Sequence, residues 1–197
     1  MDYRKFNRKA AIACLVVITA SAIAVIMIGV QSAPSAPKEL AQSTSDYMVM
    51  RVYSTDGKIL GEALRPEAGD IELYQYEHTT YHTINYIPGA GASSVTHTPV
   101  TVVKLWDKAS VNLTRLFMRG AYIPSVQILF YRAGAIDTLY YNVTLMNVRI
   151  VSILISSDVD TTFEMVSFDY QSIYWIDELH NIWYGIDRNG IELSPPL

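Results

Sequence analysis

Hydrophobic and polar residues alternate in short runs along most of the chain after residue 46. A period of two places every second side chain on the same face, which is typical of half-buried β-strands. We predict strands at 48–53, 71–80, 99–106, 125–132, 137–148, 163–176 and around 182–184, with 149–156 continuing the fifth strand past a bend. In the 163–176 run, one face carries Glu164, Val166, Phe168 and Tyr170.

One stretch has helical spacing instead. Asp107 is a suitable N-cap, Arg119 lies in the last turn, and Gly120 can end the helix in the left-handed conformation. The apolar face of this helix consists of Ala109, Leu113, Leu116 and Phe117. Many strands with one helix predict a mainly β fold of two packed antiparallel sheets with one α-helix, either a small β-barrel or a sandwich, with the helix plugging or flanking one side.

Turn residues separate these runs. Asp56-Gly57 predicts a tight hairpin turn, and a proline and a glycine mark 65–70 as a loop. The longest interruption is 81–98, which holds a proline and two glycines and has no sustained period. Structureless connections of this length in a compact domain are usually either functional or disordered, and we predict a projecting loop here.

A different pattern occupies the N-terminus, where Ala10 to Val30 contains no charged side chain. A helix of that length spans about 30 Å, the thickness of a hydrocarbon core. Four cations precede it: Arg4, Lys5, Arg8 and Lys9. The positive-inside rule then predicts a cytoplasmic N-terminus and export of the remainder. We expect a transmembrane or signal helix within 1–30, a flexible Ser/Ala/Pro-rich linker at 31–45, and one domain at 46–197.

Three fates of this segment remain open. It can be an uncleaved signal anchor, since it exceeds the usual signal-peptide core of about 7–15 residues. It can be a signal peptide cleaved at the Ala-Ser-Ala site at 20–22, or after Ala33 or Ala36, each of which precedes a proline. The Lys-Ala-Ala-Ile sequence at 9–12, directly before the apolar stretch, also resembles an archaeal prepilin-peptidase site.

Composition narrows the function classes. The 197-residue chain has a formal charge of -4, and because residues 1–30 carry +3, the remainder carries -7. That acidity argues against a nucleic-acid binder. Cys14 is the single cysteine, which excludes an intrachain disulfide. The 14 tyrosines suit half-buried sheet surfaces and contacts between copies of the chain.

Residues that carry chemistry are present, but their spacing does not indicate a site. On one strand, His78 and His82 would lie about 13 Å apart, too far to share a metal ion. No spacing ties His97 to either, so we expect surface or interface histidines, His180 included. The Asp-Val-Asp at 158–160 begins like a calcium loop but lacks its glycine and closing glutamate, which favours a turn. We predict no catalytic, cofactor or metal site and no enzyme activity.

Several short motifs follow one another along the domain. They are a His-Thr-Pro strand start at 97–99, an Asp-Lys-Ala-Ser helix start at 107–110, a strand ending in Phe-Tyr-Arg at 130–132, and strands at 141–148 and 166–175. Their order resembles the haemolysin-coregulated protein (Hcp) family, the tube protein of type VI secretion systems. The motif residues are Thr98, Pro99, Asp107, Lys108, Ser110, Gly120, Phe130, Tyr131, Asn147, Tyr170 and Trp175.

The resemblance implies a barrel that assembles with copies of itself into six-membered rings, which stack into a hollow tube. A contractile machine propels such tubes, so sheath, spike and cargo effector proteins become expected partners. By the same resemblance, the loop at 81–98 reaches the neighbouring ring. Its ring-stacking residues are then Tyr86, Pro88, Gly89, Gly91, Ser94 and His97.

Three function hypotheses follow. Family members typically lack an N-terminal membrane segment, whereas this chain is predicted to have one. The first hypothesis is therefore a tube or ring subunit that is membrane-tethered or exported. The second is a pilin-like or secreted extracellular filament subunit that uses the same barrel. The third is a monomeric binding domain for a carbohydrate or peptide, using exposed tyrosine and tryptophan. The expected location is membrane-anchored with the C-terminal domain outside the cytoplasm, or extracellular after cleavage.

Overall fold

The computed structural model describes residues 45–83 and 94–195. The predicted membrane segment at 10–30, nearly all of the linker, and the loop residues Tyr86, Pro88, Gly89 and Gly91 lie outside these ranges. Within them, no helix combines the length and the apolar character needed to cross a bilayer.

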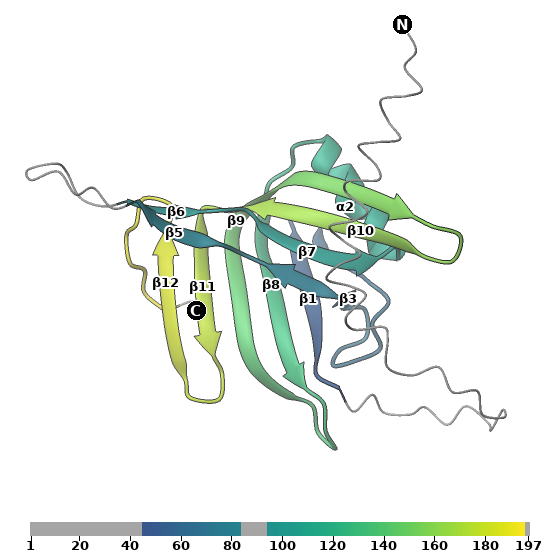
Figure 1. Cartoon of the computed structure of the whole chain (residues 1–197), viewed down its shortest axis with the longest axis horizontal. Coiled ribbons are helices and arrows are strands. Elements are labelled where there is room, and N and C mark those ends of the chain that lie inside the picture. The colour runs from purple at the N-terminus through teal and green to yellow at the C-terminus, as the bar shows by residue number, and fades with distance from the viewer. Residues whose placement is uncertain (1–44, 84–93, 196–197) are drawn as a thin grey trace, which may run out of the picture. The chain divides into compact units, whose positions relative to one another are not determined.

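Two antiparallel sheets form the body of the domain (Figure 1). In the first sheet the strand order is β1–β8–β9–β11–β12, and β2 and β3 share the other edge of β1. These strands are β1 (Tyr47–Ser54), β2 (Gly57–Ile59), β3 (Ile71–Leu73), β8 (Ile123–Arg132), β9 (Thr138–Ser157), β11 (Ser172–Asp177) and β12 (Ile182–Asp187). The predicted hairpin turn at Asp56-Gly57 is confirmed, since Gly57 has φ 114° and pairs with Ser54.

The second sheet has the order β9–β10–β7–β4. Its further strands are β4 (Gln75–Glu77), β7 (Val100–Leu105) and β10 (Thr162–Asp169). A separate two-stranded hairpin consists of β5 (Thr80–Thr83) and β6 (Ser94–His97). The mainly β architecture with two sheets and one helix is the one that the alternation predicts.

Strand β9 joins the two sheets because its halves pair with different neighbours. Residues 138–148 pair with β8, and 149–157 pair with β10. The change of sheet occurs at Asn147, whose φ of 57° is left-handed, a conformation that asparagine tolerates better than most residues. Its Nδ2 donates a hydrogen bond of 2.9 Å to Oε1 of Gln171. The predicted continuation past a bend is confirmed.

A second crossing closes the barrel on the opposite side. β3 pairs with β1, β4 pairs with β7, and between them the backbone N–H of Tyr74 donates to the carbonyl of Val103 at 2.8 Å. The prediction of one continuous strand at 71–80 is therefore wrong. So is the single strand at 163–176, which divides at Tyr170-Gln171 into β10 and β11. In both cases the chain passes from one sheet to the other, which its alternation does not reveal.

The predicted helix is confirmed as α2 (Lys108–Met118). Asp107 caps it: its Oδ1 accepts from the N–H of Ala109 at 2.9 Å, and its own N–H donates to Oγ of Ser110 at 3.1 Å. Gly120 follows with φ 57°. The buried face of α2 completes the core between the sheets, where Leu113 packs in one cluster with side chains such as Phe168.

Lys104 lies fully buried where β7, β10 and α2 meet. Its Nζ donates to the carbonyl of Leu105 at 2.7 Å and to Oγ of Ser110 at 2.8 Å. Two carboxylates complete its surroundings, Oε2 of the equally buried Glu164 at 3.0 Å and Oδ1 of Asp107 at 2.8 Å. This network, which we call the Lys104 network, ties the start of the helix to the second sheet.

A second buried acid secures the 60–70 loop. Asp70 is inaccessible to solvent, and its carboxylate accepts from Nε of Arg51 at 3.0 Å and lies 2.7 Å from Nζ of Lys58. Glu67 bridges the same two cations at the surface. The loop thereby covers a small cluster on the outer face of the first sheet that includes Tyr131.

Replacement of Lys104 by methionine tests the Lys104 network. Lys104→Met leaves the Glu164 carboxylate buried beside an apolar side chain, so we expect the free energy of unfolding to fall by about 3–5 kcal/mol. Urea denaturation followed by circular dichroism measures the change. Lys108→Met, at the exposed first residue of α2, is the matched control and should change it by less than about 0.5 kcal/mol. Equal stability of the two variants would contradict the assigned role.

Candidate functional site

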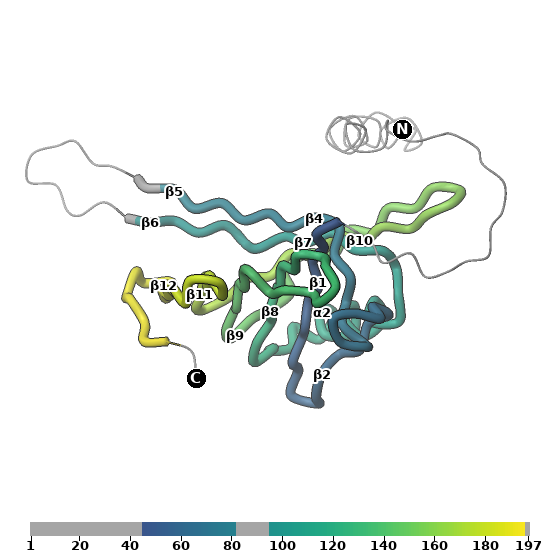
Figure 2. The backbone as a smooth tube through the Cα atoms, turned by 90° about the horizontal axis from the view of Figure 1, so that it is seen from below, coloured from purple at the N-terminus to yellow at the C-terminus, as the bar shows by residue number. Residues whose placement is uncertain are grey.

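The β5–β6 hairpin leaves the barrel and extends past β12 (Figures 1 and 2). Its register pairs Thr80 with His97 and Thr83 with Ser94. The predicted projection is thus confirmed for the described ends of the 81–98 segment, but their expected lack of secondary structure is wrong. Four-residue strands are too short to show a period, and the pairing joins residues far apart in the sequence.

Three hydrogen bonds fasten the base of this hairpin. The N–H of Thr98 donates to the carbonyl of Thr79 at 3.0 Å, and the N–H of Thr79 donates to Oγ1 of Thr98 at 3.1 Å. The Thr98 hydroxyl in turn donates to the Thr79 carbonyl at 3.1 Å. The threonine of the His-Thr-Pro motif therefore clamps the two legs of the hairpin together where they join the barrel.

Five aromatic rings gather at the same place, and we call them the base cluster: His78, His97, Tyr170, Trp175 and Tyr184. The rings of His78 and His97 stack with centroids 5.9 Å apart, and His97 stacks on Trp175 at 6.2 Å. Trp175 stacks on Tyr184 at 6.1 Å, while Tyr170 meets both imidazoles edge-on. The two histidines belong to the hairpin legs and the other three rings belong to the barrel.

The environment of His78 favours a neutral ring. Its Nε2 lies 2.7 Å from the hydroxyl of Tyr170. Burial lowers the pKa of His78 below its ordinary value and the neighbouring His97 lowers it further, whereas a hydrogen bond to the Thr98 backbone opposes them. Burial also raises the pKa of the Tyr170 phenol, which keeps that partner uncharged.

His97 is placed differently. Among the described residues, no hydrogen-bond partner reaches either of its ring nitrogens, both of which are buried. Burial lowers the pKa of His97, and the nearby positive charge of Arg188 lowers it further. A buried polar atom without a partner costs about 1–3 kcal/mol, so packing of the ring offsets a real penalty here.

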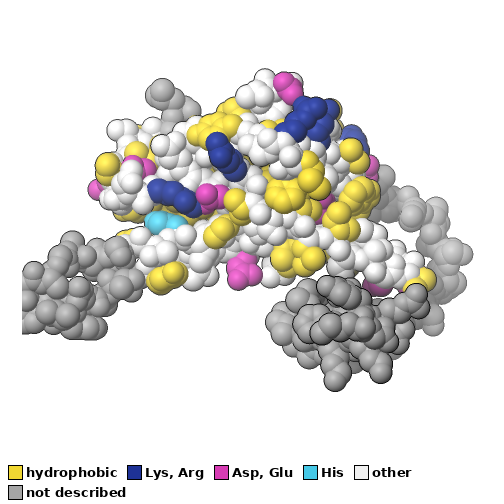
Figure 3. All heavy atoms as spheres, turned by 90° about the horizontal axis from the view of Figure 1, so that it is seen from above, with side chains coloured by type: hydrophobic (Ala, Val, Ile, Leu, Met, Phe, Trp, Pro, Cys, Tyr) yellow, Lys and Arg dark blue, Asp and Glu magenta, His cyan; other side chains and the backbone are white. Residues whose placement is uncertain are grey.

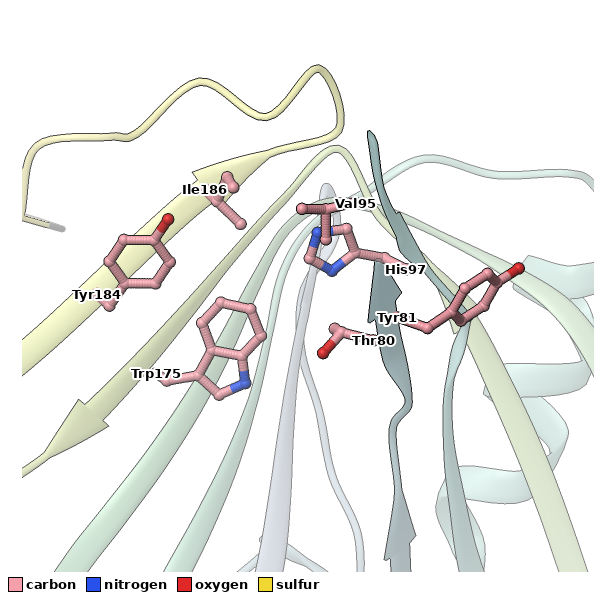
Figure 4. Close-up of a pocket in the computed structure, with 7 residues that line it drawn as sticks. All are labelled: Thr80, Tyr81, Val95, His97, Trp175, Tyr184 and Ile186. Atoms are coloured by element: carbon pink, nitrogen blue, oxygen red, sulfur yellow. The ribbon is translucent and has the colours of Figure 1, made fainter. Parts of the chain in front are cut away.

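A pocket of about 240 Å³ opens beside His97, between the hairpin and strands β11 and β12 (Figure 4). Aromatic and aliphatic side chains form most of its wall. It is lined by Thr80, Tyr81, Val95, His97, Trp175, Tyr184 and Ile186. No group of three potential metal ligands occurs anywhere in the described residues.

The remaining motif residues serve the barrel. Phe130 packs edge-on against Tyr76 at 5.5 Å and lies 5.2 Å from the ring of Tyr141. Tyr131 faces the opposite side of β8 and stacks on Tyr47 at 5.3 Å. The motifs therefore converge on three places. These are the hairpin base (Thr98, Pro99, Tyr170, Trp175), the helix ends (Asp107, Lys108, Ser110, Gly120) and the barrel wall (Phe130, Tyr131, Asn147).

Two buried arrangements were not predicted from the sequence. The expectation of surface or interface histidines did not include the stacking of His78 on His97, both of which are half-buried, whereas His180 is exposed beside Asp177 as expected. The Lys104–Glu164 pair was also missed. One signal was available, since Glu164 is in phase with Val166 on an inward-facing strand face.

The second sheet presents an apolar surface to solvent, which we call the outer apolar face. Its members share the outward side of β7, β9 and β10 or adjoin it: Tyr74, Val103, Leu105, Leu154, Phe163 and Met165. Tyr74, Leu154 and Phe163 are 51%, 46% and 39% exposed. Figure 3 shows one side of the molecule, on which hydrophobic side chains reach the surface in several groups. Contiguous exposed apolar surface marks interaction sites in soluble proteins.

Comparison with known proteins adds independent evidence. A family model described as type VI secretion system effector, Hcp, matches residues 52–176. Among solved structures, an Hcp1 variant from E. coli EAEC 042 is 23% identical with a TM-score of 0.65, over 72% of this chain and 97% of its own. The secreted protein Hcp3 from Pseudomonas aeruginosa is 24% identical with a TM-score of 0.61, over 73% and 98%.

Hcp1 from Salmonella typhimurium is 19% identical with a TM-score of 0.63, over 76% of this chain and 99% of its own. No curated protein sequence gives a significant match. At these identities the structures establish the fold, and the family model carries the assignment of the family.

The clamp at the hairpin base predicts a local effect of Thr98→Val. This change removes a hydroxyl that makes two of the three bonds to Thr79, each worth about 0.5–1.5 kcal/mol. We expect faster amide hydrogen exchange in 79–83 and 94–98, with the melting temperature nearly unchanged. Thr101→Val, which removes a hydroxyl bonded to Ser167 on the barrel, is the control and should leave hairpin exchange as it is. Slower or unchanged exchange in Thr98→Val would contradict the clamp.

Proposed function

Because this chain belongs to the Hcp family of type VI secretion systems, we propose that it is a structural subunit whose copies form rings that stack into a tube. The observation that carries the proposal is the extent of the family match, which runs from within β1 into β11 and so includes α2, the second sheet and all of the first sheet except β12 and most of β1. The family consists of structural proteins rather than enzymes. By resemblance to it, the ring is a homohexamer.

The outer apolar face is our candidate for the lateral contact between neighbouring subunits. Tyr74 and Phe163 meet edge-on at 6.4 Å, which gives the face a fixed aromatic centre. Leu154 and Met165 extend it across β9 and β10, where they are register partners. Burial of such a face on a second copy removes apolar area from water at about 25 cal/mol per Å², which favours association.

The β5–β6 hairpin is our candidate for contact between successive rings. Its support is the projection of the strands from the barrel and the position of Ser94 and His97 on β6. The remaining proposed stacking residues, Tyr86, Pro88, Gly89 and Gly91, follow β5 and precede β6 in the sequence, outside the described residues. A hairpin that is held at its base by hydrogen bonds between its own legs can contact a neighbouring ring without disturbing the barrel.

The N-terminal segment leads us to propose that the barrel lies outside the cytoplasm, either tethered or exported. This part of the proposal is supported by the sequence, through the uncharged stretch from Ala10 to Val30 and the cations before it. The competing function is a pilin-like or secreted filament subunit, which is favoured by the Lys-Ala-Ala-Ile sequence at 9–12.

Sequencing of the mature N-terminus from cells separates these fates. We expect an intact Met1, because the apolar stretch is long enough to remain as an anchor. A start at Ala11 would instead support the pilin leader, and a start after residue 22 or 36 would support secretion. Either of these results contradicts permanent tethering.

Ring assembly is the central test. We expect the full chain in mild detergent to form rings in electron micrographs. We also expect Phe163→Glu to reduce the ring fraction at least tenfold, because each interface would then bury a carboxylate without a partner. Ile136→Glu places the same charge at an 85% exposed position in the β8–β9 turn and should assemble normally. A strictly monomeric wild type at high concentration contradicts the tube, and intact rings in Phe163→Glu contradict only the lateral face.

A further inference from the structure

We propose that His78 and His97 form an acid-sensitive latch, which holds the β5–β6 hairpin against the barrel when both rings are neutral and releases it when they are protonated. The latch is a property of the single chain. Its consequence for ring stacking rests on the proposed function, because only an assembled tube would use the hairpin between rings.

The location of the two rings supports a latch. His78 lies two residues before the start of β5, and His97 is the last residue of β6. Each leg of the hairpin therefore carries one imidazole where it meets the barrel. The rings stack on one another at 5.9 Å and rest against Trp175 and Tyr170. In the described residues, the strands β5 and β6 pair only with each other. No backbone pairing between these strands and the barrel strands is present in the described residues. The hairpin is therefore held to the barrel by its two connecting segments and by side-chain contacts, including those of the base cluster.

Protonation turns this attraction into repulsion. Two imidazolium rings at this separation repel each other in a site of reduced dielectric constant, whereas neutral rings stack favourably. Arg188, at the end of β12, adds a third positive charge near His97, and its ion-pair partner Asp169 offsets that charge in part. The other titratable groups that face the pair are the phenols of Tyr170, Tyr81 and Tyr184. Burial raises the pKa of Tyr170, so it supplies no compensating negative charge.

Protonation would also change the hydrogen bonding of both rings. Neither nitrogen of His97 has an acceptor within the described residues, so a protonated ring can be solvated only by opening the contact. The adjoining pocket gives water a place from which to enter. Nε2 of His78 faces the Tyr170 hydroxyl, and protonation turns this nitrogen from acceptor to donor, so the hydroxyl must rotate to accept from it.

The pH range follows from the direction of the pKa shifts. Burial holds the pKa of both histidines below the ordinary value of about 6.5. The closed hairpin therefore binds fewer protons than the open one at mildly acidic pH. Its stabilisation is complete above that ordinary value and declines as the pH falls through the lowered values. A move from a neutral to an acidic compartment would loosen the hairpin, and with it the stacking of the proposed rings.

Amide hydrogen exchange of the full chain, below its assembly concentration, tests the latch. After correction for the intrinsic pH dependence of exchange, we expect the amides of 79–83 and 94–98 to exchange at least tenfold faster at pH 5.5 than at pH 7.5. The core strands β8 and β9 supply the internal reference. In His97→Phe, which keeps a stacking ring but leaves only His78 to be protonated, this acceleration should be clearly smaller than in the wild type. His180→Phe removes an exposed histidine and should respond as the wild type does.

Unchanged hairpin exchange in the wild type, or the same acceleration in His97→Phe, overturns the latch. If His97→Phe does not fold, an NMR titration of the wild-type imidazoles decides, and a His97 pKa at or above 6.5 overturns the proposal. A chain that forms no rings but opens in acid supports the latch and contradicts the tube. A chain that forms rings but whose hairpin exchange does not depend on pH supports the tube and contradicts the latch.

Discussion

The buried ammonium group of Lys104 holds the second sheet and the start of the helix together. A lysine without solvent exposure is tolerated only when its charge and its hydrogen bonds are satisfied, and here that requires β7, β10 and the start of α2 to be in place together. Ser110 serves two purposes, since its hydroxyl completes the helix cap and also accepts from Lys104. The helix can therefore close the core in one position only, and the motif residues at its start are explained by that constraint.

The barrel leaves its interaction surfaces on the outside because the chain itself closes the core. Strand β9 passes from one sheet to the other at Asn147, and the segment from β3 to β4 crosses back near Tyr74. With the interior filled in this way, apolar side chains such as Phe163 remain partly exposed on the outside of the second sheet. Their placement on one flat sheet face suits association with copies of the same chain, in agreement with the family to which the chain belongs.

The hairpin base contains both the contacts that hold the β5–β6 hairpin to the barrel and the two histidines of the proposed latch. The His-Thr-Pro motif gives each residue a distinct task there. His97 contributes a stacked ring, Thr98 clamps the two legs, and Pro99 leads into β7. An aromatic cluster is well suited to this position, because stacked neutral rings give a contact of moderate strength that a change of charge can weaken. The same arrangement explains why a ring with two unpartnered nitrogens is retained in an otherwise well-satisfied site.

Much of this could be predicted from the sequence, where the information is local. Alternation identified most of the strands, and Asp107, the apolar spacing and Gly120 predicted α2 with both of its ends. The motif order indicated the family. The sequence alone could not show that the 71–80 and 163–176 runs divide, that 81–83 and 94–97 pair, that His78 meets His97, or that Glu164 faces Lys104. Each of these depends on contacts between residues far apart in the chain, and such contacts exist only once the two sheets have packed. Local sequence thus specifies the helix, most of the strands and the helix caps, whereas packing of the two sheets specifies which charged side chains and which rings are buried against each other.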